Sequence, residues 1–307
     1  MNSLRRWKHS VVRDLAWVIS SPSLISRDSG MVSDSWCGDT FETNLSALQR
    51  LDAAPIHLLN LLEKNQSPRL GRYFEVLVGY WLREISGHEV IAQNLTVSDA
   101  SRSLGEFDLL FRDQTTCRVM HWELSVKFYL KFKGQFIGPN PRDTFDKKIN
   151  KVFGQQLRLS RLSEARSRLQ SLIGDEPIYP KAFIRGRLFY PALSDWRHPE
   201  IIDGISRNHE RGWWCYHSEL DRWSARCDRE HRWLILGRME WMSPVERGSP
   251  KGLLSSLALG VFVNDYFTRA YQALMVAELE FSDGAWVEVS RGVVVDDSWP
   301  GKVKADV

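Results

Sequence analysis

The sequence predicts an α/β protein, and three patterns support this fold class. Residues 70–84 carry apolar side chains at helical spacing. In residues 119–130 every even position is apolar and most odd positions are polar, as in a β-strand. A basic segment with a helical apolar stripe begins near residue 143, and a strand pattern covers residues 181–190. With strands at 88–97 and 104–111, the order is helix, three strands, basic helix and strand.

The composition is typical of a globular protein. The chain has 307 residues, of which 43% are hydrophobic and 26% are charged. Its four cysteines form no small-domain disulfide framework, which indicates a reducing compartment, so the cytoplasm is the expected location. We expect no signal peptide and no membrane association, because no apolar run approaches the ~20 residues that a membrane-spanning helix needs.

The first part of the chain, residues 1–60, is expected to be an N-terminal helical region. Residues 10–20 are predicted to form a short helix that ends before Pro22. Residues 27–44 are polar and rich in glycine, serine and aspartate, which favours a loop. Residues 45–64 regain helical spacing, with apolar side chains at Leu48, Leu51, Ile56, Leu59 and Leu62.

The helix predicted at residues 70–84 has two apolar faces and should be largely buried. Glu75 lies within this apolar surround, with Gly71 and Gly79 one turn away on either side. A buried carboxylate needs a compensating partner. Two partners remain open for Glu75: the neighbouring Arg72, or a bound cation.

Two adjacent predicted strands each carry a carboxylate. Asp108 lies in the strand at residues 104–111, and Glu123 lies on the polar face of the strand at 119–130, which it shares with Lys127. Paired strands are ~4.8 Å apart, so the two carboxylates would repel each other unless a cation lies between them. Mg²⁺ binds one or two protein carboxylates together with water and phosphate oxygens. The alternative is an ordinary amphipathic sheet whose polar face is solvated.

The net charge of +3 says little, but the charge is unevenly distributed. Residues 127–170 contain 11 lysines and arginines against 3 acidic residues, which gives this segment a charge of +8. A polyanion such as DNA or RNA suits this segment, although a solvated helix face would look the same. We predict nucleic-acid contacts for the following residues: Lys147, Lys148, Lys151 and Gln156.

The last third of the chain is predicted to be rich in β-strands. Strand patterns cover residues 213–220 and 232–242, and a hairpin with an Asp-Gly turn joins residues 273–281 to 285–295. A helix is predicted at 253–271. We therefore expect a core at residues 61–220 and a β-rich region at 221–307, which can pack with the core as one unit.

Several segments resemble known families. Helix Glu75, strand Asp108, strand Glu123 with Lys127 and a basic helix, in that order, resemble the PD-(D/E)xK nuclease superfamily, whose restriction-endonuclease-like core has the order αβββαβ. A second likeness, to an uncharacterised bacterial family called domain of unknown function 1853, spans almost the whole chain. It rests on these segments: Arg-Asp-Leu-Ala-Trp (13–17), Gly-Arg-Tyr-Phe-Glu (71–75), Leu-Gly-Glu-Phe-Asp (104–108), His-Trp-Glu-Leu-Ser-Val-Lys-Phe-Tyr-Leu (121–130) and Gly-Trp-Trp (212–214).

The superfamily resemblance implies cleavage of nucleic acid with Mg²⁺ or Mn²⁺, with Asp108 and Glu123 as metal ligands and Glu75 as an accessory acid. The usual lysine, two residues after the glutamate, is replaced by Ser125, and Lys127 lies about 6.6 Å further along the same face. Lys127 is the residue expected to assist the attacking water or the transition state. Two other functions remain open: a non-catalytic nucleic-acid-binding protein on an inactivated nuclease-like fold, and a protein-interaction scaffold.

Overall fold

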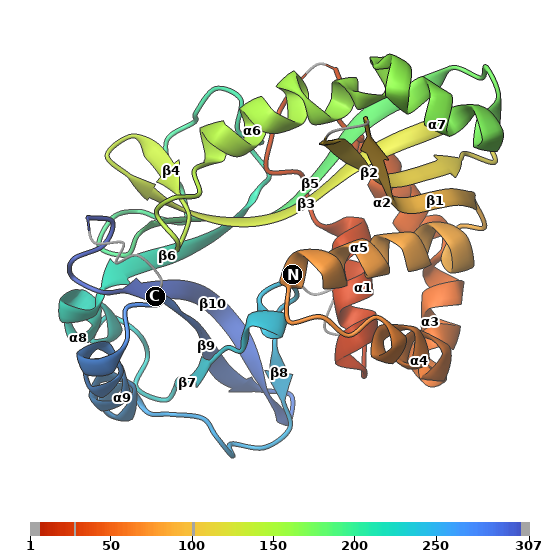
Figure 1. Ribbon diagram of the computed structural model, residues 1–307. Coiled ribbons are helices and arrows are strands. Elements are labelled where there is room, and N and C mark those ends of the chain that lie inside the picture. Colours follow the sequence, from red (N-terminus) through yellow and green to blue (C-terminus); the bar gives the residue numbers. More distant parts are fainter. Residues whose placement is uncertain (1–6, 28, 100–101, 302–307) are drawn as a thin grey trace.

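The computed structural model describes residues 7–27, 29–99 and 102–301. Its described residues contain a mixed sheet of ten strands (Figure 1). The main path of the sheet runs in the order β1-β2-β3-β5-β6-β10-β9-β7, while β4 pairs with β3 and β8 pairs with β10. The strands are β1 Glu89–Ser98, β2 Ser103–Arg112, β3 Val119–Phe132, β4 Gln135–Ile137, β5 Ile178–Pro191, β6 Glu210–Tyr216, β7 Arg232–Ile235, β8 Glu246–Arg247, β9 Leu274–Ser282 and β10 Ala285–Val295.

Helices cover both faces of the sheet. In Figure 1, α1–α5 gather on one side of β1–β3, α6 and α7 run across the other side, and α8 and α9 lie beside the C-terminal strands. The α-helices are α1 Ser10–Ser20, α2 Asp34–Thr43, α3 Leu45–Ala53, α4 Ile56–Lys64, α5 Leu70–Tyr80, α6 Phe145–Gly154, α7 Ser163–Ile173, α8 Leu220–Ser224 and α9 Ser256–Arg269. A mixed α/β fold is thus confirmed.

The side chains of strand β3 alternate between two faces of the sheet, and hydrophobic clusters cover both faces, as the sequence pattern predicts. Met120, Trp122 and Leu124 pack into the cluster that includes the N-terminal helices. On the other face, Val119 and Tyr129 join the clusters formed with α6 and α7. The polar side chains between them, including Glu123, therefore face α6 rather than bulk water.

The prediction of a loop at residues 27–44 is wrong in its second half, because α2 occupies Asp34–Thr43. The Ser33 side chain accepts a hydrogen bond from the backbone N–H of Trp36 and so caps the helix. Cys37 and Phe41, one turn apart, are the buried residues of this short helix. Two inward-facing side chains in a polar segment are too few to give a periodic signal.

Two further predicted elements are shorter than expected. The helix predicted at 45–64 is divided into α3 and α4 at Pro55, which has no N–H to continue the helical hydrogen bonds. The strand predicted at 232–242 ends at Ile235 and is followed by a 3-10 turn over Arg238–Glu240. The helix predicted at 70–84 is α5 continued by a π-helical turn over Trp81–Ile85.

Core strands and C-terminal strands share the sheet. Strand β5 pairs in parallel with β3 and β6, and β10 pairs in parallel with β6. The sheet therefore crosses the boundary predicted at residue 220, although the division into three regions stays a prediction. Among the described residues, the helices are all too short or too polar to span a bilayer.

Candidate functional site

The candidate site lies where β2 and β3 separate. The two strands are paired antiparallel from Arg112 with Val119 to Leu109 with Trp122. Continuing this register by one residue places Asp108 opposite Glu123. At this point the backbone N–H of Leu124 donates to Oδ2 of Asp108 at 2.8 Å. The acceptor is therefore a side-chain carboxylate and not a backbone oxygen of β2. Asp108 and Glu123 are consequently brought together, as the sequence pattern predicts.

Glu123 is held by neutral side chains. Its side chain is only 1% exposed, and Oε1 lies 3.0 Å from Nε2 of His121, which is itself fully buried. Burial lowers the pKa of His121 to about 4, so the ring is uncharged at neutral pH. The amide of Gln156, in the 3-10 helix Gln156–Arg161 that follows α6, donates to Oε2. These partners orient the carboxylate without neutralising it.

Both carboxyl groups titrate far above their ordinary range. Burial raises the pKa of Glu123 to about 7, against the opposing influence of Lys148 and of hydrogen bonding with Asp108. Burial, and then the charge of Glu123, raise the pKa of Asp108 to about 7, while the Leu124 N–H opposes the rise. At neutral pH the pair consequently tends to keep a proton. A divalent cation would allow both groups to ionise.

The lysine closest to the acid pair in electrostatic terms is Lys148 on α6. Burial, followed by repulsion from Lys127, lowers the pKa of Lys148, while Asp108 and Glu123 raise it. Its Nζ donates to Oε1 of Gln156 at 3.4 Å, so the ammonium shares a partner with Glu123. Lys148 therefore supplies positive charge beside the two carboxylates.

Lys127 is placed differently from the sequence-based expectation. It does lie on the same face of β3 as Glu123, but its Nζ is 2.5 Å from Oδ2 of Asp143, with which it forms an ion pair. Asp143 also accepts a hydrogen bond from the Tyr129 hydroxyl. The predicted catalytic role of Lys127 stays a prediction, and in this structure its charge is directed to Asp143.

Glu75, on α5, forms an ion pair and a hydrogen bond with neighbouring side chains. Its Oε2 lies 3.1 Å from Nη1 of Arg72 and accepts a hydrogen bond of 3.0 Å from Nδ2 of Asn94 on β1. Asn94 has a left-handed backbone (φ 51°) in the middle of its strand. The charge of Glu75 still raises the pKa of Asp108. Glu75 thus lies near the acid pair but is already compensated by Arg72.

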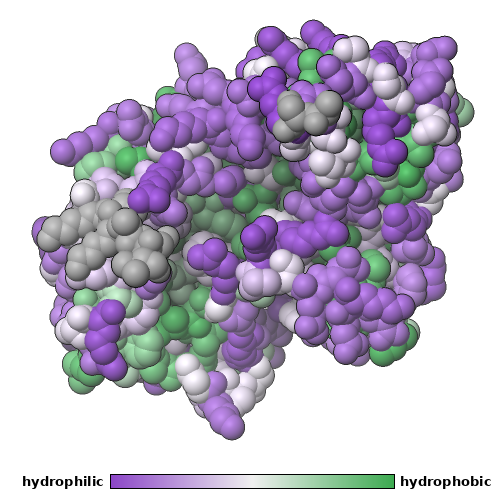
Figure 2. Space-filling view, viewed as in Figure 1, coloured by the Kyte–Doolittle hydropathy of each residue, from purple (hydrophilic) through white to green (hydrophobic). Residues whose placement is uncertain are grey.

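Two other predicted nucleic-acid contacts, Lys147 and Lys151, are exposed on α6. Lys147 makes a single 3.5 Å contact with the backbone oxygen of Arg142, and the charge of Lys151 lowers the pKa of Glu123. Figure 2 shows hydrophilic side chains along the surface that α6 and α7 form in Figure 1. Lys147 and Lys151 therefore add positive charge to the exposed face of the helix that also carries Lys148.

The sequence contained a signal for the inward position of Lys148. It follows the buried Phe145 by three residues and precedes the buried Val152 by four, so it lies on the apolar stripe of α6. A lysine on the buried face of a helix needs a reason to be there. Here that reason is the pair of carboxylates beneath it.

The donor set suits a hard divalent cation. Mg²⁺ and Mn²⁺ accept two protein carboxylates together with water and phosphate oxygens as ligands. Among the residues that the structure describes, no group of three or more histidine, cysteine, aspartate or glutamate side chains is arranged to hold a metal ion. Any ion here would accordingly rely on Asp108 and Glu123, with its remaining ligands supplied by water and substrate.

Comparison with known proteins gives one match. A search of curated proteins and a search of solved structures found no match. The family model described as "Domain of unknown function (DUF1853)" matches residues 13–295. This range includes β1 to β10 and the residues of the candidate site. The chain therefore belongs to the DUF1853 family.

Proposed function

We propose that this protein hydrolyses phosphodiester bonds of DNA or RNA with the help of Mg²⁺ or Mn²⁺. The observation that carries the proposal is the convergence of two carboxylates, the buried Glu123 and the half-buried Asp108, whose pKa values are both raised to about 7. Neither forms an ion pair with a lysine or arginine among the described residues. An acid pair left in this state is destabilising unless it has a cation to bind, and pKa perturbation of this kind is characteristic of functional sites.

We further propose that α5 to β5 is a restriction-endonuclease-like core. Its main elements occur in the order α5, β1, β2, β3, α6 and β5, which is the αβββαβ order, with β4, α7 and short helical turns added. Strands β1, β2 and β3 are antiparallel neighbours, and β5 is added in parallel to β3. The acid pair lies at the junction of β2 and β3.

In this proposal Asp108 and Glu123 hold the ion, and Glu75 adds negative charge from α5. When bound, such an ion polarises the scissile phosphate and lowers the pKa of a bound water. His121 and Gln156 fix the orientation of Glu123 through their hydrogen bonds.

Lys148 holds positive charge beside the position where negative charge develops on the phosphate, the role that the sequence assigns to Lys127. The half-buried position of Lys148 on α6 strengthens this interaction. Lys147 and Lys151, exposed on the same helix, would contact flanking phosphates of the DNA or RNA strand.

The direct test is cleavage of plasmid, single-stranded DNA and RNA by the purified full chain in the presence of Mn²⁺. We expect cleavage, and we expect Asp108→Asn and Glu123→Gln each to reduce its rate by about 100-fold or more. The matched control is Glu230→Gln, because Glu230 is an exposed carboxylate on a loop before β7. Its rate should equal that of the unmodified chain.

Two results would overturn the nuclease proposal in favour of a different function. Binding of nucleic acid that weakens with salt, without cleavage of any substrate, would support a non-catalytic nucleic-acid-binding protein. Absence of both cleavage and binding would support a protein-interaction scaffold. Cleavage that persists in both carboxylate variants would point to a contaminating nuclease.

A further inference from the structure

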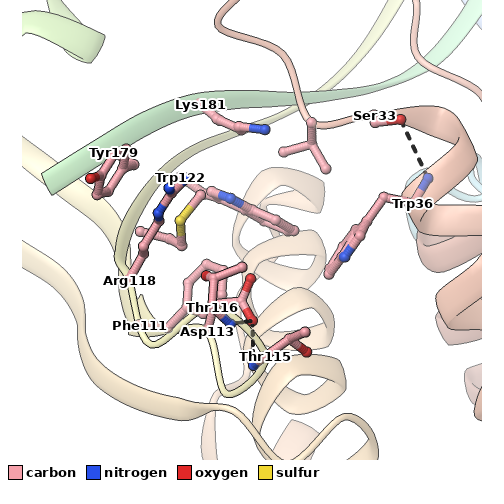
Figure 3. Close-up of a pocket in the computed structure, with 12 residues that line it drawn as sticks. Ser33, Trp36, Phe111, Asp113, Thr115, Thr116, Arg118, Trp122, Tyr179 and Lys181 are labelled. Atoms are coloured by element: carbon pink, nitrogen blue, oxygen red, sulfur yellow. Dashed lines mark hydrogen bonds between the residues drawn. The ribbon is translucent and has the colours of Figure 1, made fainter.

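A cavity lies on the opposite face of β3 from the acid pair. Its volume is about 410 Å³, within the range of small-molecule pockets. Figure 3 shows that its walls come from the N-terminal end of α2, the turn between β2 and β3, and the first residues of β5. Trp122 points into this cavity, whereas the next residue, Glu123, faces α6, so the two sites share a strand but not a surface.

One part of the cavity is built from aromatic rings. The ring of Trp122 packs edge to face with that of Trp36, with centroids 5.6 Å apart, and with that of Phe111, with centroids 5.0 Å apart. Trp36 is only partly buried although it lies in this cluster. A ring exposed in a cavity, next to others already fixed in position, offers a face on which a flat aromatic group can stack.

The other part of the cavity is positively charged. Lys181 and Arg118 both line it, and the guanidinium of Arg118 lies 4.7 Å from the centre of the Tyr179 ring. Within the described chain, neither cation has an ion pair with a carboxylate. The nearby Asp113 uses one carboxylate oxygen to accept the backbone N–H groups of Thr115 and Thr116 within its own turn. The cavity thus has positive charge to offer an anion.

A buried donor points to the same ligand. Trp122 is 2% exposed, and its indole Nε1 has no acceptor among the described residues. An unpaired buried N–H is unfavourable, so a ligand that supplies an acceptor for it is bound more tightly. In Figure 3 the ring nitrogen of Trp122 lies on the side of the indole that faces Arg118 and Tyr179. The free donor and the cations are therefore at the same end of the cavity.

We propose that this cavity binds a small, flat aromatic molecule that carries a carboxylate or phosphate group. The aromatic ring stacks against Trp36, the partly exposed ring of the cluster. The anionic group accepts the Trp122 N–H and is neutralised by Lys181 and Arg118. Aromatic carboxylates and nucleoside monophosphates share this chemistry. The site is separate from the proposed nuclease centre, and its occupancy does not depend on that activity.

The test is calorimetric titration of the full chain with two probes, uridine 5′-monophosphate and indole-3-acetate. We expect at least one probe to bind with a Kd below about 1 mM. Binding of the nucleotide alone identifies a phosphate ligand, and binding of the indole acid alone identifies a carboxylate ligand. Failure of both probes to bind at this concentration would overturn the proposal.

Variants locate the binding in this cavity. Lys181→Met and Arg118→Met should each weaken binding about tenfold, and Trp122→Phe, which keeps a ring but removes the N–H, should weaken it by a similar factor. Lys64→Met, at an exposed lysine on α4, is the control. Folding of each variant is checked by its unfolding midpoint in urea. Folded variants that bind as tightly as the control would contradict the assignment.

Discussion

Two regions of the same sheet bury a glutamate, and they compensate its charge in opposite ways. On β10, Glu288 and Arg291 are both fully buried, with hydrogen bonds of 2.8 and 2.6 Å from the guanidinium to the two carboxylate oxygens. The rest of the guanidinium donates to the backbone oxygens of Glu240, Trp241 and Ser243. On β3, Glu123 receives only neutral partners and has a second carboxylate beside it.

The difference separates a structural ion pair from a candidate active site. The Arg291 guanidinium uses its donors within the protein, and Glu288 also accepts the backbone N–H of Val245. The charges of Glu288 and Arg291 are thus satisfied within the protein. Asp108 and Glu123 instead have raised pKa values and no ion pair with a lysine or arginine among the described residues, and Lys148 acts on them at a distance. A fold tolerates this cost where the charge serves binding or catalysis.

The largest expected effect comes from breaking the structural pair. Replacing Arg291 by methionine removes the cation that hydrogen-bonds to Glu288 and leaves only Arg187, at 4.0 Å, so we expect the free energy of unfolding to fall by about 3–5 kcal/mol. Urea denaturation measures this loss. Arg226→Met, at an exposed arginine after α8, is the matched control and should change stability by less than about 0.5 kcal/mol. Equal stability of the two variants would show that Glu288 is not paired as described.

Removing a charge at the acid pair should have the opposite sign. Glu123→Gln keeps the shape of the side chain and eliminates a carboxylate whose pKa is raised to about 7. At pH 8, without added metal, we expect the free energy of unfolding to rise by about 2 kcal/mol. Glu288→Gln under the same conditions should lower it, because Arg291 loses its counter-charge. If Glu123→Gln also lowers stability at pH 8, Glu123 is a structural residue and the comparison fails.

The same raised pKa values fix the direction of a pH effect. Between about pH 4.5 and pH 7 the unfolded chain has released the protons of Asp108 and Glu123, whereas the folded protein still holds them. The contribution of these groups to stability therefore falls as pH rises through this window. The double variant Asp108→Asn/Glu123→Gln should lack this fall when unfolding is compared at pH 5 and pH 7.5. If the free energy of unfolding depends on pH in the same way in the unmodified chain and in the double variant, the assignment is contradicted.

The smallest expected effect is a difference in cleavage rate between variants of Lys148 and Lys127. Lys148→Ala should reduce the cleavage rate about tenfold or more, because Lys148 lies on the buried stripe of α6 beside the acid pair. Lys127→Ala should have less effect, since Asp143 already neutralises that ammonium. Lys147→Ala, at an exposed position on α6, is the control. A larger loss for Lys127→Ala than for Lys148→Ala would restore the role that the sequence assigns to Lys127.

Much of this arrangement could be predicted from the sequence. The alternation in residues 119–130 places Glu123 on one face and Trp122 on the other, and the distance along the chain allows Asp108 to pair with it. These are local or nearest-neighbour properties, for which side-chain periodicity is a direct signal. For this reason the sequence was sufficient to predict that Asp108 and Glu123 lie side by side.

Contacts between segments that are far apart in the sequence could not be predicted from the sequence. The alternation of side chains along the strand places Lys127 on the same face as Glu123. It cannot show that Lys127 forms an ion pair with Asp143, which follows the turn at residues 138–141. Helix α2 forms because Cys37 and Phe41 pack on a core supplied by other elements, not because of strong helical periodicity. The aromatic cavity joins α2, the β2–β3 turn and β5, and only the tertiary structure brings these together.

The most direct test of the central claim is a titration of the full chain with Mn²⁺ at pH 7.5, in which electron paramagnetic resonance measures the bound ion. The account predicts a saturable site that is present in the unmodified chain and in Glu230→Gln, and that is lost in the double variant Asp108→Asn/Glu123→Gln. Loss of the site should accompany loss of cleavage. Mn²⁺ bound with equal affinity by the double variant would show that the two carboxylates are not the metal ligands.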